Sequence, residues 1–183
     1  MIKLSWMSGA ALAACVLLAG CFTSEQPLFD QALGSPLMGA GDVEITTHDT
    51  DKEEAGTLHW QSGVYVDLTD KDHASISFHR LPGTWPWDGW YVGETQMSDA
   101  PGKGYLYELY RKQGGRLYNY NVSCSDLTDL EAAQTHMARS ESNQECTATR
   151  QADLAAALRL LAKRESPDGY WTWKPAPPAP AGP

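Results

Sequence analysis

Tyr105-Leu-Tyr-Glu-Leu-Tyr-Arg-Lys-Gln-Gly-Gly-Arg-Leu-Tyr-Asn-Tyr-Asn-Val122 is the stretch of sequence that decides the fold of this chain. Both halves of the stretch are rich in tyrosine and leucine and repeat them with the short period of a strand. Gly114 and Gly115 separate the halves, and both tolerate the positive φ that a tight hairpin turn requires. The stretch therefore predicts two antiparallel strands joined by a short turn.

The chain on either side of this hairpin shows the same period, with turn signals recurring at short intervals. Further strands are expected at 43–45, 57–60, 64–68, 74–81 and 90–95, and 169–173 is a candidate for a final strand. Consecutive strands with short turns form an antiparallel meander, and about seven of them can curl into a small closed or partly open barrel without exposed edges. The sequence predicts a mainly β fold of this kind.

The period changes to that of a helix in two places after the meander. The apolar residues with this spacing are Leu127, Leu130, Ala133 and Met137 near 126–138, and Leu154, Ala157, Leu158 and Leu161 near 150–164. We therefore expect one or two helices in the C-terminal part of the chain.

The N-terminal segment has the parts of an export signal. Lys3 supplies a positive start, and residues 10–19 form an uncharged apolar core much shorter than the ~20 residues of a membrane-spanning helix. The core ends in Leu18-Ala-Gly-Cys21, which resembles the lipobox of bacterial membrane lipoproteins. The resemblance implies that residues 1–20 are removed and that Cys21 then carries a diacylglyceryl group and an N-acyl group such as palmitate. The alternatives are an ordinary secretory signal with an incidental cysteine and a short uncleaved anchor.

Two neighbouring features bear on the cellular location that this resemblance implies. Phe22 follows the cysteine where the inner-membrane retention signal best known from enteric bacteria has Asp. This implies the outer membrane, with the domain facing the periplasm. Pro27-Leu-Phe29 is loosely similar to a segment that many small Gram-negative envelope lipoproteins have soon after the lipidated cysteine. That likeness implies no activity.

The remaining cysteines fit an exported domain. Cys15 would leave with the signal peptide and Cys21 would carry the lipid, so Cys124 and Cys146 are the two left. A pair of cysteines in an exported chain favours a disulfide, which here would fasten the helical part to the sheet. Metal ligation or redox chemistry is the alternative, but there is no Cys-x-x-Cys spacing and no neighbouring histidine.

These assignments divide the chain into four parts. Residues 1–20 are the signal peptide, and 21–41 are the lipidated cysteine and a tether containing proline and glycine. Residues 42–173 form a single β-rich domain, and the proline-rich residues 174–183 form a disordered tail. Part of the tether has enough apolar residues to dock on the core, namely Leu28, Phe29, Leu33, Leu37 and Met38.

The charge of the chain restricts its partners. The formal net charge is −9 at pH 7, which disfavours nucleic acid and electrostatic docking to anionic lipid headgroups, although it could equally serve solubility. Membrane attachment would then depend on the acyl chains, because each buried CH₂ contributes ~0.8 kcal/mol.

The sequence contains no recognisable catalytic pattern. It lacks Gly-x-Ser-x-Gly, Ser-x-x-Lys, a Gly-rich phosphate loop and His-Glu-x-x-His. His73 and His79 would share one face of a continuous strand, but no third ligand stands nearby, so we expect no metal site. Sequence alone cannot bring together carboxylates such as Asp88 and Glu94. We therefore expect neither an enzyme nor a bound cofactor.

The most prominent group of side chains is aromatic. Trp85, Trp87 and Trp90 fall within six residues, around a proline and an Asp-Gly turn. Exposed indoles could stack on sugar rings of peptidoglycan or lipopolysaccharide, or form a hot spot for a protein partner. Trp85 and Trp90 could instead cap one end of a small barrel, which would leave Trp87 as the most exposed of the three.

Three functions fit these features. The first is a non-catalytic, lipid-anchored envelope protein that contacts another envelope protein or peptidoglycan. The second is a carrier of a small apolar ligand, similar to lipocalins in architecture only, since the Gly-x-Trp start of that family is not clearly present. The third is an inhibitor of a cell-wall hydrolase, because some lysozyme inhibitors are similar in being lipid-anchored, disulfide-bearing β-barrels.

Overall fold

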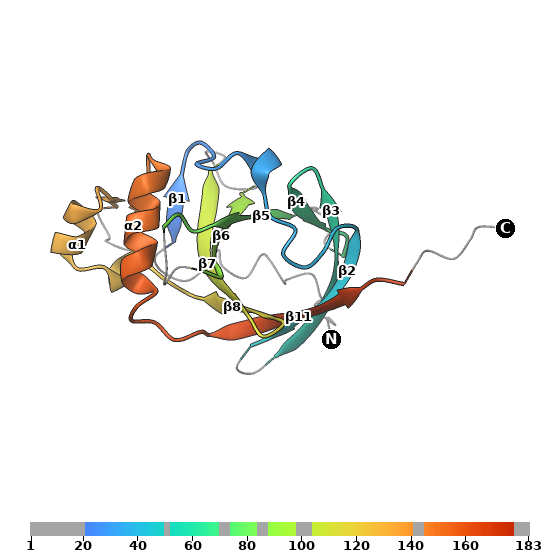
Figure 1. Ribbon diagram of the computed structural model, residues 1–183. Coiled ribbons are helices and arrows are strands. Elements are labelled where there is room, and N and C mark those ends of the chain that lie inside the picture. The colour runs from blue at the N-terminus through green and yellow to red at the C-terminus, as the bar shows by residue number, and fades with distance from the viewer. Residues whose placement is uncertain are drawn as a thin grey trace, which may run out of the picture.

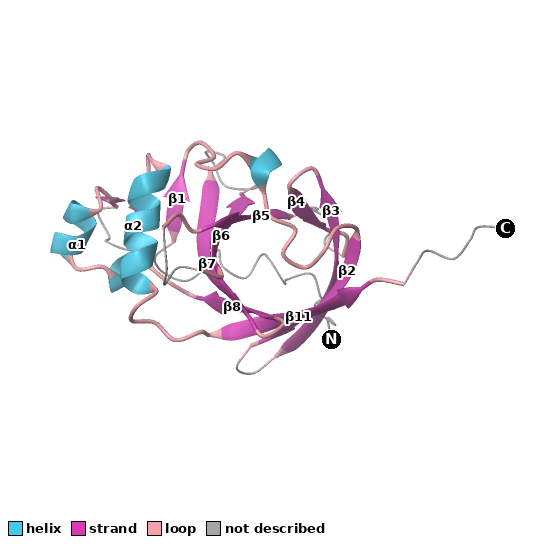
Figure 2. Cartoon of the chain, in the orientation of Figure 1, coloured by secondary structure: helices cyan, strands magenta, loops and turns pink. Residues whose placement is uncertain are grey.

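The computed structural model describes residues 21–49, 52–69, 74–83, 88–97, 104–140 and 145–177. Eight strands form a closed antiparallel barrel, which Figures 1 and 2 show as a ring. They are β2 (Asp42–His48), β3 (Glu53–Gln61), β4 (Val64–Asp67), β5 (Ser75–Arg80), β6 (Trp90–Gln96), β7 (Tyr105–Gln113), β8 (Arg116–Tyr120) and β11 (Gly169–Pro175). The prediction of a mainly β meander that closes into a barrel is confirmed.

The ring closes through its last strand. Strands β2 to β8 follow one another as a meander, each antiparallel to the next. Strand β11 then lies antiparallel to both β8 and β2, with Trp171 opposite Leu117 on one side and Thr47 on the other. The candidate strand at 169–173 is therefore present, and it is the element that closes the seven-stranded meander.

The β7–β8 hairpin forms as the sequence predicts. Gly114 and Gly115 have φ values of 58° and 77°, and Gln113 lies opposite Arg116 on either side of them. Positive φ at two consecutive central residues is the geometry of a type I′ turn, whose twist matches that of the two strands.

A small sheet branches from the barrel at β7. Strand β8 pairs with residues 109–113 of β7, and β1 (Phe22–Ser24) takes the same edge at residues 105–107. Strand β10 (Cys146–Thr147) runs parallel to β1, and β9 (Ala138–Arg139) pairs with β10. These short strands place the start of the domain against the first residues of β7.

The two helices are shorter than predicted. Helix α1 (Asp129–Gln134) begins at Thr128, whose hydroxyl accepts from the Glu131 N–H while the Glu131 carboxylate accepts from the Thr128 N–H. A 3-10 turn (Cys124–Asp126) precedes α1, and Ala138 belongs to β9, so the range 126–138 is only partly helical. Helix α2 (Gln151–Leu161) packs outside the ring of strands (Figure 1).

Two separate cores hold the fold together. One fills the barrel and contains Tyr65, Phe78, Tyr110 and Trp171. The other lies between α2 and the outer barrel wall, where Leu154, Leu158 and Leu161 meet Val92 and Leu109. The wall formed by β6 and β7 is therefore buried on both faces.

The expected tether is part of the domain. Phe22 is fully buried, Phe29 joins the core beneath α2, and Leu37 and Met38 join the core inside the barrel. The structure corrects the prediction of a spacer at 21–41, because β1 is paired in a sheet and the segment docks on the two cores at several of its apolar residues. Only Leu33, of the five apolar residues considered, is largely exposed.

The predicted tail also begins later than expected. Strand β11 continues to Pro175, which lies opposite Val43. Residues 174 and 175 thus belong to the barrel, because a proline is tolerated at the end of a strand. Residues 178–183 lie outside the described part of the chain.

Candidate functional site

Cys21, the residue expected to be lipidated, immediately precedes β1 and is bound to the sheet. Its carbonyl oxygen accepts a hydrogen bond from the Cys146 N–H at 3.1 Å, and residues 22–24 are 0 to 8% exposed. Burial, together with the carboxylates of Glu108 and Glu145, raises the pKa of the Cys21 thiol. The thiol of the folded chain is therefore protonated at neutral pH and is a weak nucleophile.

Cys124 and Cys146 form the predicted disulfide next to this position. Their Cα atoms are 5.2 Å apart, and both residues are fully buried. Cys124 follows the last strand of the meander, whereas Cys146 lies in β10 beside β1. The bond therefore fastens the segment containing α1 and β9 to the barrel.

Of the three tryptophans Trp85, Trp87 and Trp90, the structure describes Trp90, which is buried. Trp90 is the first residue of β6 and is 6% exposed, with its ring centroid 4.9 Å from that of Tyr120 and the Arg111 guanidinium 5.3 Å from its ring. A partner or glycan contact by Trp90 is thus wrong, because its indole is part of the core beneath α2. Trp85 and Trp87 lie outside the described residues.

Aromatic rings occupy the middle of the barrel. The Phe78 ring lies 6.0 Å from Tyr65, 5.1 Å from Tyr110 and 6.1 Å from Trp171, measured between centroids. A side chain at Gly93 would approach the Tyr110 ring to 2.6 Å, so a glycine is needed for this packing. The protein's own side chains fill this part of the interior.

The segment before β2 covers one mouth of the barrel. The Tyr65 hydroxyl donates to the Gly39 carbonyl and accepts from the Met38 N–H, each at 2.9 Å. Lys112 donates from Nζ to the Leu37 carbonyl. These bonds hold Leu37 and Met38 in the interior core.

A carboxylate is buried on the outer wall of the barrel beneath the N-terminal segment. Glu94 is 1% exposed, and its Oε2 accepts from the N–H groups of Leu28 at 3.1 Å and Phe29 at 3.3 Å. The Tyr107 hydroxyl lies 2.7 Å from Ser24 Oγ and also accepts from the Leu28 N–H. Burial raises the pKa of Glu94, although the hydrogen bonds from Tyr107 and the two backbone groups act against this.

A histidine completes this buried group. The His79 ring stacks on Phe29 with centroids 4.6 Å apart, and its Nε2 lies 2.9 Å from Ser77 Oγ. Burial lowers the pKa of His79 to about 4, so the ring is neutral at physiological pH. Glu94, Tyr107 and His79 are all at most 6% exposed. The network is closed to substrates in this conformation, and it holds residues 24–29 against the barrel.

This network could not be predicted from the sequence. Asp88, considered above as a partner for Glu94, is instead exposed and pairs with Arg80. The acceptor and donors at Glu94 are separated by 65 or 66 residues, and the donors are backbone groups of a loop. A contact between a side chain and distant backbone groups leaves no pattern of side chains in the sequence from which it could be predicted.

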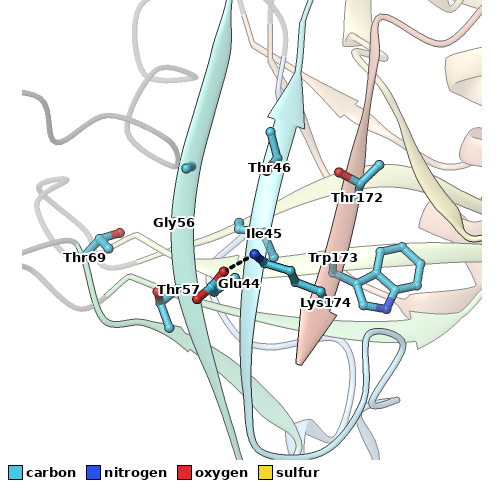
Figure 3. A pocket seen from close by; sticks show the side chains of 10 residues that line it. Glu44, Ile45, Thr46, Gly56, Thr57, Thr69, Thr172, Trp173 and Lys174 are labelled. Carbon is cyan, nitrogen blue, oxygen red and sulfur yellow. Dashed lines mark ion pairs between the residues drawn. The ribbon is translucent and has the colours of Figure 1, made fainter. Parts of the chain in front are cut away.

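The outer surface of β3, β2 and β11 carries a partly open groove of about 460 Å³ (Figure 3). Val43 and Ile45 point into the barrel core. Because side chains alternate along a strand, Glu44 and Thr46 point outward. The outward-pointing residues that line the groove are Glu44, Thr46, Ala55, Thr57, Thr172 and Lys174. Glu44 and Lys174 form an ion pair of 2.9 Å across β2 and β11, as Figure 3 shows. Hydroxyl groups and a balanced ion pair suit a polar ligand.

An aromatic stack borders this groove. The Tyr170 ring lies 4.5 Å from the His48 ring, and the Arg116 guanidinium lies 4.4 Å from the Tyr170 ring. His48 Nε2 in turn lies 3.2 Å from Thr172 Oγ1 in the groove. Tyrosine and arginine are enriched at protein interfaces, which makes this face the best candidate for partner contact among the described residues.

Within the described ranges, no three His, Cys, Asp or Glu side chains are placed to hold a metal ion. His79 is buried on β5, whereas His73 lies outside those ranges. None of the helices in the described part of the chain is both long and apolar enough to span a membrane.

The fold defines a closed eight-stranded antiparallel barrel with a helical, disulfide-bonded extension. Comparison of the chain with protein-family models, curated protein sequences and solved structures found no match.

Proposed function

We propose that this protein is a lipid-anchored envelope protein with a non-catalytic binding or structural role. In this proposal residues 1–20 are a signal peptide and Cys21 carries the acyl groups that hold the barrel to the outer membrane, facing the periplasm. The observation that carries the proposal is Leu18-Ala-Gly-Cys21, which ends directly before the first strand of a disulfide-bonded domain. A disulfide agrees with an oxidising compartment such as the periplasm.

The packing of the barrel supports a partner on its outer surface. A carrier of small apolar ligands would need empty volume where Tyr65, Phe78, Tyr110 and Trp171 meet. The groove over β3, β2 and β11 instead faces outward and carries threonine hydroxyl groups and the Glu44–Lys174 ion pair. We therefore favour an envelope protein or peptidoglycan as the partner over a ligand inside the barrel.

Mass spectrometry of the N-terminal peptide tests the anchor. The full chain would be expressed in a Gram-negative host, extracted in detergent and digested. We expect a peptide beginning at Cys21 with diacylglyceryl and N-acyl groups, and membrane fractionation that is lost in Cys21→Ser. An unmodified N-terminus, or Cys21→Ser that stays with the membrane, would overturn the proposal. Protease resistance of Cys21→Ser shows whether the barrel still folds.

Photo-crosslinking in intact cells tests the binding surface. A photoreactive residue at Thr172 in the groove is compared with one at Glu165, which is exposed and follows α2. We expect Thr172 to yield a specific adduct with a protein or with peptidoglycan, and Glu165 to yield none. Equal adduct patterns from the two positions would refute a binding role for the groove.

A further inference from the structure

We infer that the acyl anchor joins the barrel without a flexible spacer, so that the lipid surface meets the β1–β10–α1 end and the groove over β3, β2 and β11 faces away from it. This inference rests on the proposed acylation of Cys21. It goes further by stating which surface of the barrel meets the lipid and which surface remains for a partner.

No free chain separates Cys21 from the sheet. Its carbonyl is bound to the Cys146 N–H, and Phe22 is opposite Tyr107 on one side and Cys146 on the other. A flexible tether of 20 residues, as expected from the sequence, would allow a separation of roughly 25 Å between anchor and barrel. With no free residue, only the Cys21 side chain and the glyceryl group separate the barrel from the acyl chains.

Several contacts attach β1 to the rest of the domain. The Thr23 carbonyl accepts from the Ala148 N–H at 2.8 Å, and Ser24 Oγ lies 2.7 Å from the Tyr107 hydroxyl. Glu94 binds the chain again at Leu28 and Phe29, and the Cys124–Cys146 disulfide fixes β10 beside β1. Freeing β1 would break all of these contacts and expose the fully buried Phe22.

The order of the strands places the groove around the barrel. Strand β3 is the fourth neighbour of β7 in both directions around the ring, through β8, β11 and β2 or through β6, β5 and β4. Of the groove strands, β3 and β2 therefore lie four and three strands away from β7, across the barrel from β1, whereas β11 lies two strands away. Figure 1 shows β1 and β2 at opposite sides of the ring. With eight strands, the barrel is roughly 16 Å across at the backbone.

The anchor end also carries an exposed apolar side chain. Leu130 on α1 is 67% exposed and is one of three large apolar side chains that are exposed among the described residues. Helix α1 contacts β9, which pairs with β10 beside β1. A leucine near the lipid surface can bury its side chain at the headgroup boundary, whereas the net negative charge of the chain gives no general attraction to that surface.

Quenching by labelled lipid tests this orientation. The acylated full chain is reconstituted into vesicles of phosphatidylethanolamine and phosphatidylglycerol that contain a headgroup quencher. A fluorescent non-natural residue replaces either Leu130 at the anchor end or Ala55 in the groove, both of which are exposed. We expect quenching to be about twofold or more stronger at position 130, since the barrel width separates the two positions.

A spacer variant supplies the matched control. Twelve glycine and serine residues inserted between Cys21 and Phe22 should bring the quenching at positions 130 and 55 close together, because the barrel can then rotate freely. Equal quenching at the two positions without the spacer, on protein whose acylation is confirmed by mass spectrometry, would overturn the inference and leave the anchor standing. Absence of acylation on the same sample would overturn the proposed function and the inference with it.

Discussion

Removal of the disulfide should cost the domain about 3 kcal/mol of unfolding free energy. The bond between Cys124 and Cys146 closes a loop across 22 positions, and loop-closure entropy for that length amounts to about −11 cal/mol/K, or about 3 kcal/mol at 25 °C. Cys124→Ala combined with Cys146→Ala removes the bond and leaves no hydroxyl in these fully buried positions. For a domain of this size the melting temperature should fall by about 6–12 °C.

Urea unfolding followed by circular dichroism measures this loss, with both chains in a Cys21→Ser background. Hydrogen exchange shows which part of the domain is destabilised. The Ala148 N–H, which donates to the Thr23 carbonyl, should lose protection before the amides of β4 and β5. Dithiothreitol should lower the stability of the parent towards that of the double variant and leave the variant itself unchanged. A loss below about 1 kcal/mol with an unchanged m-value would refute the reasoning.

Three further predictions concern the two cores and the buried network. Trp171→Ala, which empties part of the barrel interior at a residue 8% exposed, should cost about 3–5 kcal/mol in urea unfolding. The pKa of His79 is about 4 in the folded chain and about 6.5 in the unfolded chain. Between pH 6.5 and pH 4, therefore, the imidazole of the unfolded chain is protonated while that of the folded chain stays neutral. Stability should therefore fall as the pH drops through that window, and His79→Gln should remove this dependence in unfolding measured across it. Glu94→Leu leaves the Phe29 N–H without its acceptor and should cost about 1–3 kcal/mol, with faster hydrogen exchange at that amide.

Exposed positions supply the controls for these measurements. Leu33→Ala, at a side chain 74% exposed, and Asp88→Asn, in an exposed ion pair with Arg80, should each change stability by less than about 0.5 kcal/mol. A wild-type pH profile identical to that of His79→Gln would refute the role given to His79. Unchanged exchange at Phe29 in Glu94→Leu would show that the carboxylate does not hold the N-terminal segment.

Long strands with a regular period were the predictable part of the fold. The seven meander strands and the closing strand near Trp171 each repeat apolar residues every second position, and turn residues such as Gly114 and Gly115 separate two of them. Each strand also buries one face in the barrel, so the pattern and the packing require the same arrangement. Closure followed from the number of strands rather than from any single motif.

Short elements could not be predicted in the same way. Strands β1, β9 and β10 have two or three residues, which is too few to show a period. The prolines and glycines of residues 22–41 indicated a flexible segment, but its positions 22, 29, 37 and 38 reach two different cores. Glu94 was missed because its partners are backbone groups far away in the sequence.

Strand β7 pairs with β8 at one end of an edge and with β1 at the other, so the N-terminal end of the domain is part of a sheet. The carbonyl of Cys21 and the three residues after it belong to the sheet, so the peptide bond before Cys21 can enter a processing enzyme as an extended chain only while β1 is unpaired. If Cys21 is acylated, cleavage and acylation therefore come before β1 docks. The small sheet of β1, β10 and β9 would then be completed only after processing, and a chain in which β1 docked too early would protect its own cleavage site.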